Sequence, residues 1–593
     1  MKAPARVLAG PHASQTGSFL ILMLLVLQGP SSCSPVSMWE KGQPSTSPAF
    51  SQIKRGVYCA GCVVTVSIVQ QLAQVHNSTF QAAMERLCSY LPEELHLKDI
   101  CRAVVELFGA DIIKLLNMEM NADVVCNAVN VCKQEPGLPV CHMYKTSQEA
   151  LEMSLKKARQ TIKKPNNMAA RESFLDVCSL PYMSKICQAI EYSMDFKVPL
   201  QDFDKDNFST FPSFRGYDWR GKDCNENDGS VYPGRRPEDW DALQDSNCNG
   251  IMGIDPEDGI PYEKKFCEGT DSRGLILLGD SAGAHFHIPP EWITVEQLSL
   301  KTFSNLPLAI TNELNWPQFS AHTGFQDSTI GGWTDSIYLR LRARNRCNHR
   351  DYQNISKNGG SSGNLLNFIK SMARKQSFDK PAVVFYQMIG NDVCRWNPDT
   401  ITHMTTPGEM HSNVMQALEY LNTHLPNGSH VILIGLADGR FLWNHLHNRY
   451  YPLGQLNKDI TYEQVYSFLS CLQISPCPGW MSANETLRNL TSERALQLSR
   501  VMEKISVSQK FASFDIHYMD FPFDKIAELW KKQMGDDWQL IEPVDGFHPN
   551  QIALALQAQI VWEEALQNWP EVLGKENPFN KAIEKKFGNQ GGH

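Results

Sequence analysis

Apolar residues follow two different patterns along the chain, and the change between them divides the sequence. Between residues 56 and 142 they recur every three to four positions, the mark of amphipathic helices, as in Val104, Val105, Phe108, Ile112, Ile113, Leu115 and Leu116. From residue 273 onward, short β-rich runs alternate with helical stretches. We therefore expect an all-α module followed by an α/β domain, in which helices cover both faces of a parallel sheet.

Four runs in the second part have the composition of strands. They are RGLILLGDS from residue 273, PAVVFYQMIGND from 381, HVILIGL from 430 and FASFDIHYMDF from 511. The segment NQIALALQAQIVWEEAL, from residue 550, has the apolar spacing of a helix. The expected fold class is thus multi-domain, with a helical module and an α/β domain.

The N-terminal residues predict entry into the secretory pathway. Phe19–Leu27 is an uninterrupted apolar run that is preceded by Lys2 and Arg6 and followed by small residues. Such a run is too short to cross about 30 Å of hydrocarbon, but it suffices for a signal peptide. We expect a signal peptide at 1–33, with an uncleaved anchor as the alternative, and a Ser/Pro-rich pro-segment at 34–55.

The rest of the chain divides by composition. After the helical module at 56–142 comes a linker at 143–195, whose basic, polar stretch at 156–171 is a candidate for proteolytic processing. Residues 196–270 are rich in Asp, Asn and Gly, and residues 271–593 form the expected α/β domain.

Composition and charge narrow the function classes. The chain has 593 residues, a formal net charge of -9 and 17 Cys. A negative chain is unsuited to phosphate backbones, so we expect no nucleic-acid partner. The many cysteines fit an oxidising compartment such as the secretory pathway. Six Asn-x-Ser/Thr glycosylation sequons fit the same pathway. They lie at Asn77, Asn207, Asn354, Asn427, Asn484 and Asn489.

Three acidic loops predict a bound cation. Oxygen-bearing residues stand at alternate positions from 202, 223 and 245, a spacing that aims several hard oxygens at one ion. Calcium suits many flexible oxygen ligands, and its expected role is structural. No loop has the closing Glu of an EF-hand, and Asp255 and Glu257 are further closing candidates. The expected ligands are Asp202, Asp204, Asp206, Phe208 (carbonyl), Asp223, Asn225, Asn227, Asp228, Asp241, Asp245, Asn247, Asn249, Ile251 (carbonyl) and Glu263.

The six cysteines of the helical module, at 59, 62, 88, 101, 126 and 132, form a specific ladder. Cys59 and Cys62 alone could be half of a zinc site or a redox pair. A zinc site needs a second close pair of ligands, and a thioredoxin-like redox pair needs a βαβ fold, and the sequence around them predicts neither. The spacing resembles the saposin B-type domain. That resemblance implies the disulfides Cys59–Cys132, Cys62–Cys126 and Cys88–Cys101, and a module that binds lipid and touches membranes or micelles peripherally. A seventh cysteine, Cys141, is a candidate tether to Cys471 or Cys477.

Candidate chemistry lies in four blocks of the α/β part. Gly279-Asp280-Ser281 follows the first strand, where an exposed nucleophile sits in an α/β sheet. The others are Ser362-Gly363-Asn364, Gly390-Asn391-Asp392 and Asp545-Gly546-Phe547-His548. In this order the blocks resemble the GDSL/SGNH esterase superfamily, although Ala282 stands where that family has Leu. The resemblance implies a flavodoxin-like three-layer fold.

The same resemblance implies a serine-esterase mechanism. Ser281 is the nucleophile, His548 is the general base and acid, and Asp545 orients the imidazole. The oxyanion is held by the N–H groups of Ser281 and Gly363 and by the side-chain amide of Asn391.

Two other polar groups have two interpretations each. His285 and His287 follow the nucleophile and either line a substrate pocket or, as we favour, are structural. Arg340, Arg342, Arg344 and Arg346 alternate at strand or turn spacing. They either contact an anionic headgroup or form a solvated edge.

The order of the segments, saposin-like, calcium-bearing and SGNH lipase, resembles the acyloxyacyl hydrolase family. That resemblance implies a secreted or lysosomal (granule or vesicle) lipase that removes secondary fatty acyl chains from the lipid A part of bacterial lipopolysaccharide. It also implies two disulfide-linked subunits cut from one chain. The alternatives are a general phospholipase or lysophospholipase of the same fold, and a non-catalytic lipid-presenting protein.

Overall fold

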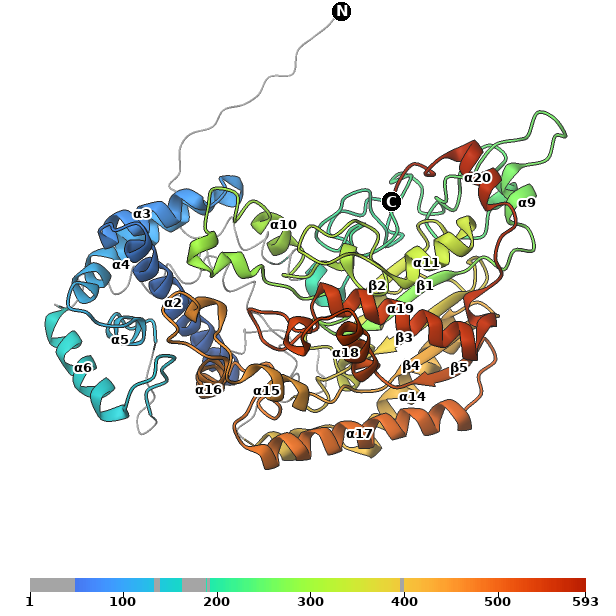
Figure 1. Ribbon diagram of the computed structural model, residues 1–593. Coiled ribbons are helices and arrows are strands. Elements are labelled where there is room, and N and C mark those ends of the chain that lie inside the picture. Colours follow the sequence, from blue (N-terminus) through green and yellow to red (C-terminus); the bar gives the residue numbers. More distant parts are fainter. Residues whose placement is uncertain (1–47, 133–138, 163–187, 189–191, 395–398) are drawn as a thin grey trace, which may run out of the picture.

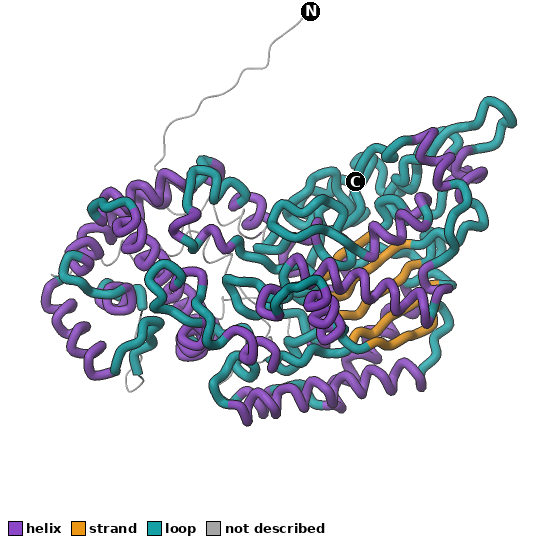
Figure 2. Tube along the Cα trace, in the orientation of Figure 1, coloured by secondary structure: helices purple, strands orange, loops and turns teal. Residues whose placement is uncertain are grey.

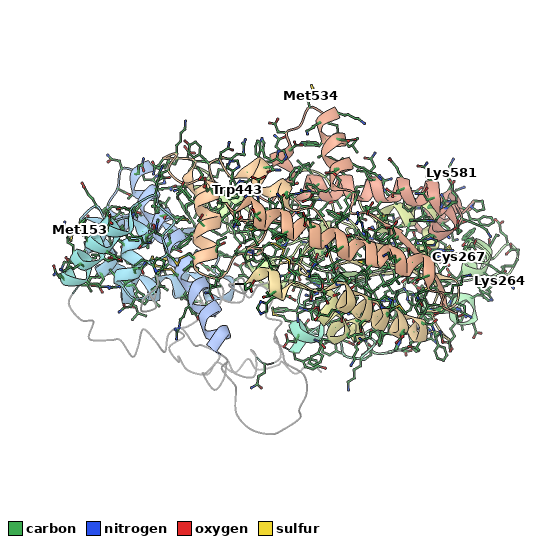
Figure 3. All side chains as sticks on the ribbon, turned by 90° about the horizontal axis from the view of Figure 1, so that it is seen from below. Met153, Lys264, Cys267, Trp443, Met534 and Lys581 are labelled. Carbon is green, nitrogen blue, oxygen red and sulfur yellow. A yellow bond between two sulfur atoms is a disulfide. The ribbon has the colours of Figure 1, made fainter. Side chains whose placement is uncertain are left out.

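The computed structural model describes residues 48–132, 139–162, 188, 192–394 and 399–593. The expected signal peptide lies outside the described residues, as does the pro-segment up to residue 47. Figure 1 shows a helical module at one end of the molecule and a sheet with its helices at the other. Met153 in the module and Lys264 in the acidic segment mark these two ends in Figure 3.

Among the described residues, the N-terminal module contains the α-helices α2 (Pro48–Val75), α3 (Phe80–Tyr90), α4 (Leu97–Leu116), α5 (Ala122–Ala128) and α6 (Gln148–Thr161). Side-chain caps start α3 and α5, because Thr79 accepts from the N–H of Ala82 and Asn121 from that of Val124. The disulfides Cys59–Cys132, Cys62–Cys126 and Cys88–Cys101 are present as expected. Cys126 lies on α5, but Cys132 lies beyond its end.

Helix α2 belongs to both parts of the protein. It begins at Pro48, inside the stretch expected to be a pro-segment. The part of the helix around Gly56 and Val57 packs on the α/β domain, where Val57 contacts Ile474. A Cβ at Gly56 would lie 2.5 Å from the carbonyl oxygen of Leu472, so only glycine permits this approach. Its C-terminal part lies in the core of the module.

The stretch Arg55–Val75 of α2 is, by length and composition, apolar enough to cross a membrane, but 61% of its most apolar window is buried inside the protein. Buried polar side chains lie along it, and Gln71 Nε2 donates to Leu453 O in the α/β domain at 2.7 Å. These features are those of a core helix shared by two packed units.

Helix α6 continues the helical module past residue 142. Leu151, Leu155 and Ala158 on one face of α6 are buried in the module's core. The first part of the basic stretch is therefore one packed helix, whereas residues 163–171 lie outside the described residues. Cys141, between α5 and α6, forms a disulfide with Cys471, the first of the two partners expected for it.

The α/β domain is built on a five-stranded parallel sheet with strand order β2-β1-β3-β4-β5. Its strands are β1 (Gly274–Gly279), β2 (Tyr352–Ser356), β3 (Ala382–Gln387), β4 (Ser429–Ile434) and β5 (Phe514–Met519). Four of the strands were expected, and β2 was not. The carboxyl ends of β1 and β3 lie side by side, because Gly279 pairs with Gln387.

Helices cover both faces of the sheet, as Figure 2 shows. On one face, Ile276 and Leu278 share a core with α14 (Pro407–His424) and α17 (Glu485–Ser508). On the other, Leu275 and Leu277 pack with α11 (Ile337–Arg344) and α19 (Gln551–Asn568). The remaining helices are α9 (Tyr262–Cys267), α10 (Leu306–Thr311), α12 (Leu365–Phe368), α13 (Thr400–His403), α15 (Arg440–Leu446), α16 (Tyr462–Cys471), α18 (Phe523–Lys532) and α20 (Asn580–Phe587).

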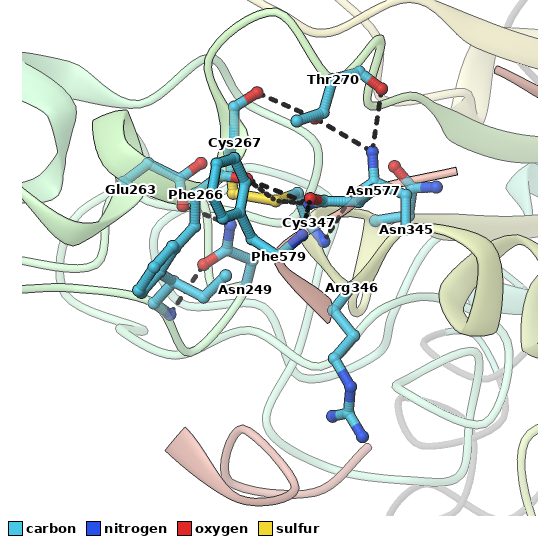
Figure 4. Close-up of a disulfide and its surroundings, with 12 residues drawn as sticks. Asn249, Glu263, Phe266, Cys267, Thr270, Asn345, Arg346, Cys347, Asn577 and Phe579 are labelled. Carbon is cyan, nitrogen blue, oxygen red and sulfur yellow. Dashed lines mark hydrogen bonds between the residues drawn. A yellow bond between two sulfur atoms is a disulfide. The ribbon is translucent and has the colours of Figure 1, made fainter. Parts of the chain in front are cut away.

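The acidic segment consists mainly of loops. Disulfides hold it together internally, through Cys224–Cys248, and to the α/β domain, through Cys267–Cys347. Beside the second disulfide, Asn577 donates both to Phe266 O and to the side chain of Asn345 (Figure 4). The segment is thus fixed to the α/β domain on several sides.

The arginine run is helical, which corrects the strand or turn spacing expected for it. Arg340, Arg342 and Arg344 lie on α11, and Arg346 begins the following 3-10 turn. Each guanidinium has an internal partner: Arg340 pairs with Asp335 and Arg346 with Glu584, Arg342 donates to His349, and Arg344 donates to Gly574 O. The run is therefore part of the packing around the C-terminus and not a free cationic edge.

One expected glycosylation site is incompatible with the fold. Asn354 lies on β2 and is 2% exposed. Its Nδ2 donates to Gly283 O and to Thr323 Oγ1, both at 2.9 Å. Since a glycan would replace a hydrogen on this buried nitrogen, the expectation at Asn354 is wrong.

Candidate active site

The Ser281 side chain stands at the carboxyl end of β1, in the tight turn that follows Gly279. Asp280 shapes this turn: its Oδ1 accepts from the N–H of Ala282 at 3.0 Å, and its Oδ2 accepts from the N–H of Ile389 at 2.8 Å. The second bond ties the turn to the residues after β3. Asp280 is a positioning residue that the sequence reading passed over, although it stands inside the Gly-Asp-Ser motif.

His548 and Asp545 complete a hydrogen-bonded chain with Ser281. His548 Nε2 lies 2.6 Å from Ser281 Oγ, and His548 Nδ1 lies 2.6 Å from Asp545 Oδ2. The other carboxylate oxygen of Asp545 accepts from the N–H groups of Phe547 and His548, at 2.8 and 3.1 Å. The loop just before α19 therefore holds Asp545 and His548 in one rigid unit. This geometry is that of an activated serine nucleophile.

The charges around His548 favour its protonated form. Burial alone would lower the pKa of His548, but the carboxylates of Asp545, Asp280 and Glu542 outweigh burial and raise the pKa above its usual 6.5. Burial also raises the pKa of Asp280 to about 6, because the backbone hydrogen bonds and His548 offset desolvation only in part. The site is thus arranged to stabilise the imidazolium that forms when Ser281 loses its proton.

Asn391 follows β3 and lies beside the nucleophile turn. Its Nδ2 donates to Gly360 O at 3.0 Å, and a Cβ at Gly360 would lie 3.0 Å from Gly279 O and 3.4 Å from Asp280 Cα. Gly360 is therefore the glycine that meets the Ser281 turn. The N–H of Gly360 donates to Lys357 O, so its role in this geometry is to orient the Asn391 amide through its carbonyl.

Gly363 lies elsewhere, which corrects its expected place beside Ser281. It is exposed, and the atoms nearest to a Cβ there are Asn413 Nδ2 at 3.7 Å and Ser361 Oγ at 4.0 Å. The reason is the short 3-10 turn Ser362–Asn364, which directs Gly363 toward α14. The Gly/Ser-rich segment contains several glycines, and sequence spacing alone does not show which of them lies beside Ser281.

The loop that carries Asn391 is anchored on both sides. Asp392 accepts from the N–H and the hydroxyl of Ser362, at 2.9 and 2.5 Å, and from Thr405 Oγ1 at 2.7 Å. Cys394, two residues further on, forms a disulfide with Cys477. These links fix the amide of Asn391 relative to Ser281.

A pocket lined mainly by apolar side chains opens at this site. Ser281, Asn391 and His548 lie on its wall. The apolar part of the wall comes from the loops and helices that follow β4 and β5 and from the segment before His548: Phe441, Leu442, Trp480, Phe521, Phe523, Ile541 and Phe547. Such a lining suits an aliphatic chain whose reacting end meets the serine.

His285 and His287 are buried and bonded into the fold, which supports the structural interpretation that the sequence favours. They are 0% and 5% exposed, and their carbonyl oxygens accept from the N–H and the indole Nε1 of Trp316. His287 Nδ1 lies 2.7 Å from a carboxylate oxygen of Glu542. The Glu542 charge raises the pKa of His287 against the effect of burial, and the N–H of Glu542 donates to His548 O. Glu542, which the sequence did not reveal, therefore links His287 to the backbone of His548.

Carboxylates of the acidic segment gather in clusters that could hold a metal ion. Asp202, Asp204 and Asp206 form one group, and Asp204 also meets Asp223 and Glu226. The first two expected loops therefore converge, and Glu226 is a ligand candidate that the sequence reading missed. Both carboxylate oxygens of Asp204, one of Asp206 and one of Asp223 are buried and have no hydrogen-bond partner in the part of the chain that the structure describes. Buried carboxylate oxygens need such a partner or a cation.

The third loop forms a second acidic group. Glu263 accepts from Asn247 Nδ2 at 3.1 Å and from Asn249 Nδ2 at 2.9 Å, beside the Cys267–Cys347 disulfide (Figure 4). The charges of Asp245 and Glu263 act on Asp241, which has one buried oxygen without a partner.

Other expected ligands of the acidic segment lie apart from these groups. Asp255 is paired with Lys265 at 2.6 Å and belongs to none of the carboxylate clusters described above. Asn227 and Asp228 are exposed, and the Asp228 carboxylate accepts from Ser230.

Comparison with known proteins bears on both halves of the chain. Residues 58–188 match the family described as saposin-like domain, and residues 275–561 match the family described as GDSL-like lipase/acylhydrolase. The chain is 60% identical to the acyloxyacyl hydrolase of Homo sapiens over 97% of its own length and 98% of the relative's. It is 62% identical to that of Mus musculus, over 93% and 96%, and 61% identical to that of Oryctolagus cuniculus, over 90% and 93%.

Proposed function

The chain belongs to the acyloxyacyl hydrolase family, and we propose that its Ser281 site removes secondary fatty acyl chains from the lipid A part of lipopolysaccharide. An acyloxyacyl bond is an ester between a fatty acid and the hydroxyl of another acyl chain. The observation that carries the proposal is the Ser281–His548–Asp545 chain of 2.6 Å contacts on the wall of an apolar pocket.

The geometry supports a two-step acyl transfer. Ser281 Oγ attacks the ester carbonyl while His548 Nε2 takes the serine proton, and the new imidazolium is held by Asp545. His548 then protonates the departing hydroxyl, which leaves an acyl ester on Ser281. A water molecule, deprotonated by His548, hydrolyses that ester and releases the fatty acid. The N–H of Ser281 and the amide of Asn391 are the proposed donors to the oxyanion.

The position of the helical module supports an amphiphilic substrate. The family match over 58–188 is to saposin-like domains, and the Cys141–Cys471 bond places the module next to the α/β domain. A lipid whose chains lie against the module is thereby kept near the serine site. A small water-soluble ester would need no such module.

Acyl release from intact lipopolysaccharide, followed by mass spectrometry, tests the proposed function. Purified protein should release secondary fatty acids and leave the primary chains, and Ser281→Ala should abolish release. Phosphatidylcholine is the comparison substrate. Exclusive cleavage of the phospholipid would favour a general phospholipase, and unchanged release by Ser281→Ala would leave only a lipid-presenting role.

We also propose that the acidic clusters bind calcium with a structural role. The partnerless buried oxygens of Asp204, Asp206 and Asp223 are hard ligands of the kind that calcium prefers. Chelation should lower the melting temperature, because calcium would bind only the folded state. Asp204→Asn should remove most of this calcium-dependent shift, whereas Asp228→Asn, outside the clusters, should keep it. A melting temperature that does not respond to chelation would refute the site.

The disulfide-rich chain is typical of the secretory pathway, and lysosomal or granule storage and secretion remain our proposal for its location. We propose that a cut in the basic stretch 156–171 yields two subunits joined by Cys141–Cys471. Glycans are proposed at the exposed Asn77, Asn427 and Asn484 and at the half-buried Asn207 and Asn489.

A further inference from the structure

Two histidines and an aspartate meet on the sheet, away from the serine site. His430 lies on β4, and Asp515 and His517 lie on the neighbouring edge strand β5. His430 is in register with Asp515, and Asp515 and His517 share one face of the sheet because they are two residues apart. Rigid parallel strands, not a mobile loop, therefore bring the three side chains together.

The three side chains converge on a common point. His430 Nδ1 lies 2.5 Å and His517 Nε2 lies 3.4 Å from the same oxygen of Asp515. One ligand atom from each residue falls within 4.8 Å of the others. Apart from this ion-pair contact, His517 Nε2 is buried and has no hydrogen-bond partner among the described residues, so it is available as a metal ligand.

The surroundings hold the imidazoles in place and leave one side open. The His517 ring packs 4.6 Å from the Trp569 ring, just beyond α19. The side chains of His430 and His517 are 12% and 13% exposed, whereas that of Asp515 is 52% exposed. Arg273 is close enough to Asp515 for their charges to interact, but its guanidinium donates to the carbonyl oxygens of Glu571 and Val572. The exposed Asp515 carboxylate therefore provides the side from which an ion can enter the group.

We propose that His430, Asp515 and His517 form a zinc site that joins the edge strand β5 to β4. Two imidazole nitrogens and one carboxylate are a ligand set for zinc, whereas calcium and magnesium prefer oxygen alone. Ligand atoms of a tetrahedral zinc ion lie about 3.4 Å apart. The His517–Asp515 contact already has this spacing, and the His430–Asp515 contact must widen by about 1 Å.

A bound ion would have a structural effect on the sheet. Ser281 and Asn391 follow the carboxyl ends of β1 and β3, whereas His430 and Asp515 are the second residues of β4 and β5. The site is thus at the opposite end of the sheet from the chemistry. Zinc would pin the edge strand to its neighbour without entering the acyl transfer.

Zinc binding to the full-length protein tests this inference. Chelator-treated protein is resupplied with calcium, so that the acidic clusters are filled, and incubated with Zn²⁺ at neutral pH. After gel filtration, bound zinc is measured by mass spectrometry. We expect His517→Gln and His430→Gln each to retain one equivalent less than the unmodified protein. His445→Gln is the matched control, since His445 pairs with Asp537 at 3.5 Å without a second histidine, and it should retain the full amount.

Two further measurements separate loss of the site from loss of the fold. Acyl release should be unchanged in every variant, and zinc should raise the melting temperature of the unmodified protein and of His445→Gln only. Asp515→Asn, at the most exposed of the three positions, replaces any histidine variant that fails to fold. Equal zinc in all proteins, or none retained by the unmodified protein at tenfold excess, would overturn the proposal.

Discussion

The side chain of Asn391 offers a quantitative test of the proposed oxyanion site. Its Nδ2 carries two hydrogens, and one of them is engaged with Gly360 O at 3.0 Å. The second has no partner among the described residues and can bond the oxyanion. Loss of one such donor costs about 3–4 kcal/mol of transition-state stabilisation. We therefore expect Asn391→Ala to lower kcat by about 10²–10³-fold. KM should change little, because the interaction strengthens only as negative charge develops on the oxygen.

The same substitution should have a separate, smaller effect on stability. Gly360 is buried, and its carbonyl would lose a donor, which costs about 1–3 kcal/mol. This loss appears in the melting temperature and not in kcat at saturating substrate. Measuring both in parallel keeps the catalytic effect apart from the structural one.

Asn413→Ala is the matched control for Asn391→Ala. Asn413 Nδ2 donates to Ser362 Oγ at 3.0 Å, on the far side of the same glycine-rich loop. That hydroxyl keeps its bond to Asp392, so kcat should stay within about twofold. The reasoning would be refuted if Asn391→Ala lost less than tenfold in kcat, or if the control lost as much.

Three further outcomes follow from the geometry. Gly360→Ala should reduce kcat severalfold, because its Cβ would lie 2.9 Å from Lys357 O and 3.0 Å from Gly279 O. Gly363→Ala should be near neutral, because its Cβ meets nothing closer than 3.7 Å. Equal kcat values for the two variants would contradict the placement of Gly360 beside the nucleophile turn. The pH profile of kcat/KM should fall on the acid side with a midpoint above pH 6.5, because His548 must be neutral to accept the serine proton and its pKa is raised. A midpoint below pH 6.5 would count against the raised pKa of His548. After limited trypsin cleavage in the basic stretch 156–171, the parent protein should migrate as one band in a gel without reductant. Cys141→Ser, which lacks the bond to Cys471, should give two bands. Two bands from both proteins would disprove the role of the Cys141–Cys471 disulfide in joining the two parts.

The sequence predicted most of the sheet but missed one strand for a physical reason. β1, β3 and β4 are dominated by aliphatic and aromatic residues, so their composition reveals them. β2 reads YQNIS and is equally buried. Its polar side chains find partners inside the fold: Gln353 bonds the backbone of Ala373, and Asn354 bonds Gly283 O. Such long-range partners are invisible to a hydrophobic pattern.

The site shows the same limit at the scale of single residues. Ser281, His548 and Asp545 stand in short motifs with few alternatives, and the structure brings them together. The glycine string had several candidates, and only the fold shows that Gly360 meets the nucleophile turn. Glu542 carried no signal at all, because its contact with His287 spans 255 positions in the sequence.

The sharing of α2 between the two cores has a mechanical consequence. The helix packs against the α/β domain at Gly56 and Val57, and the Cys141–Cys471 bond, between α5 and α6, ties the module to the same region. With these two anchors, the module is restrained from swinging about a hinge. Any movement of the module relative to the α/β domain therefore requires its helices to bend or the packing at Gly56 and Val57 to break.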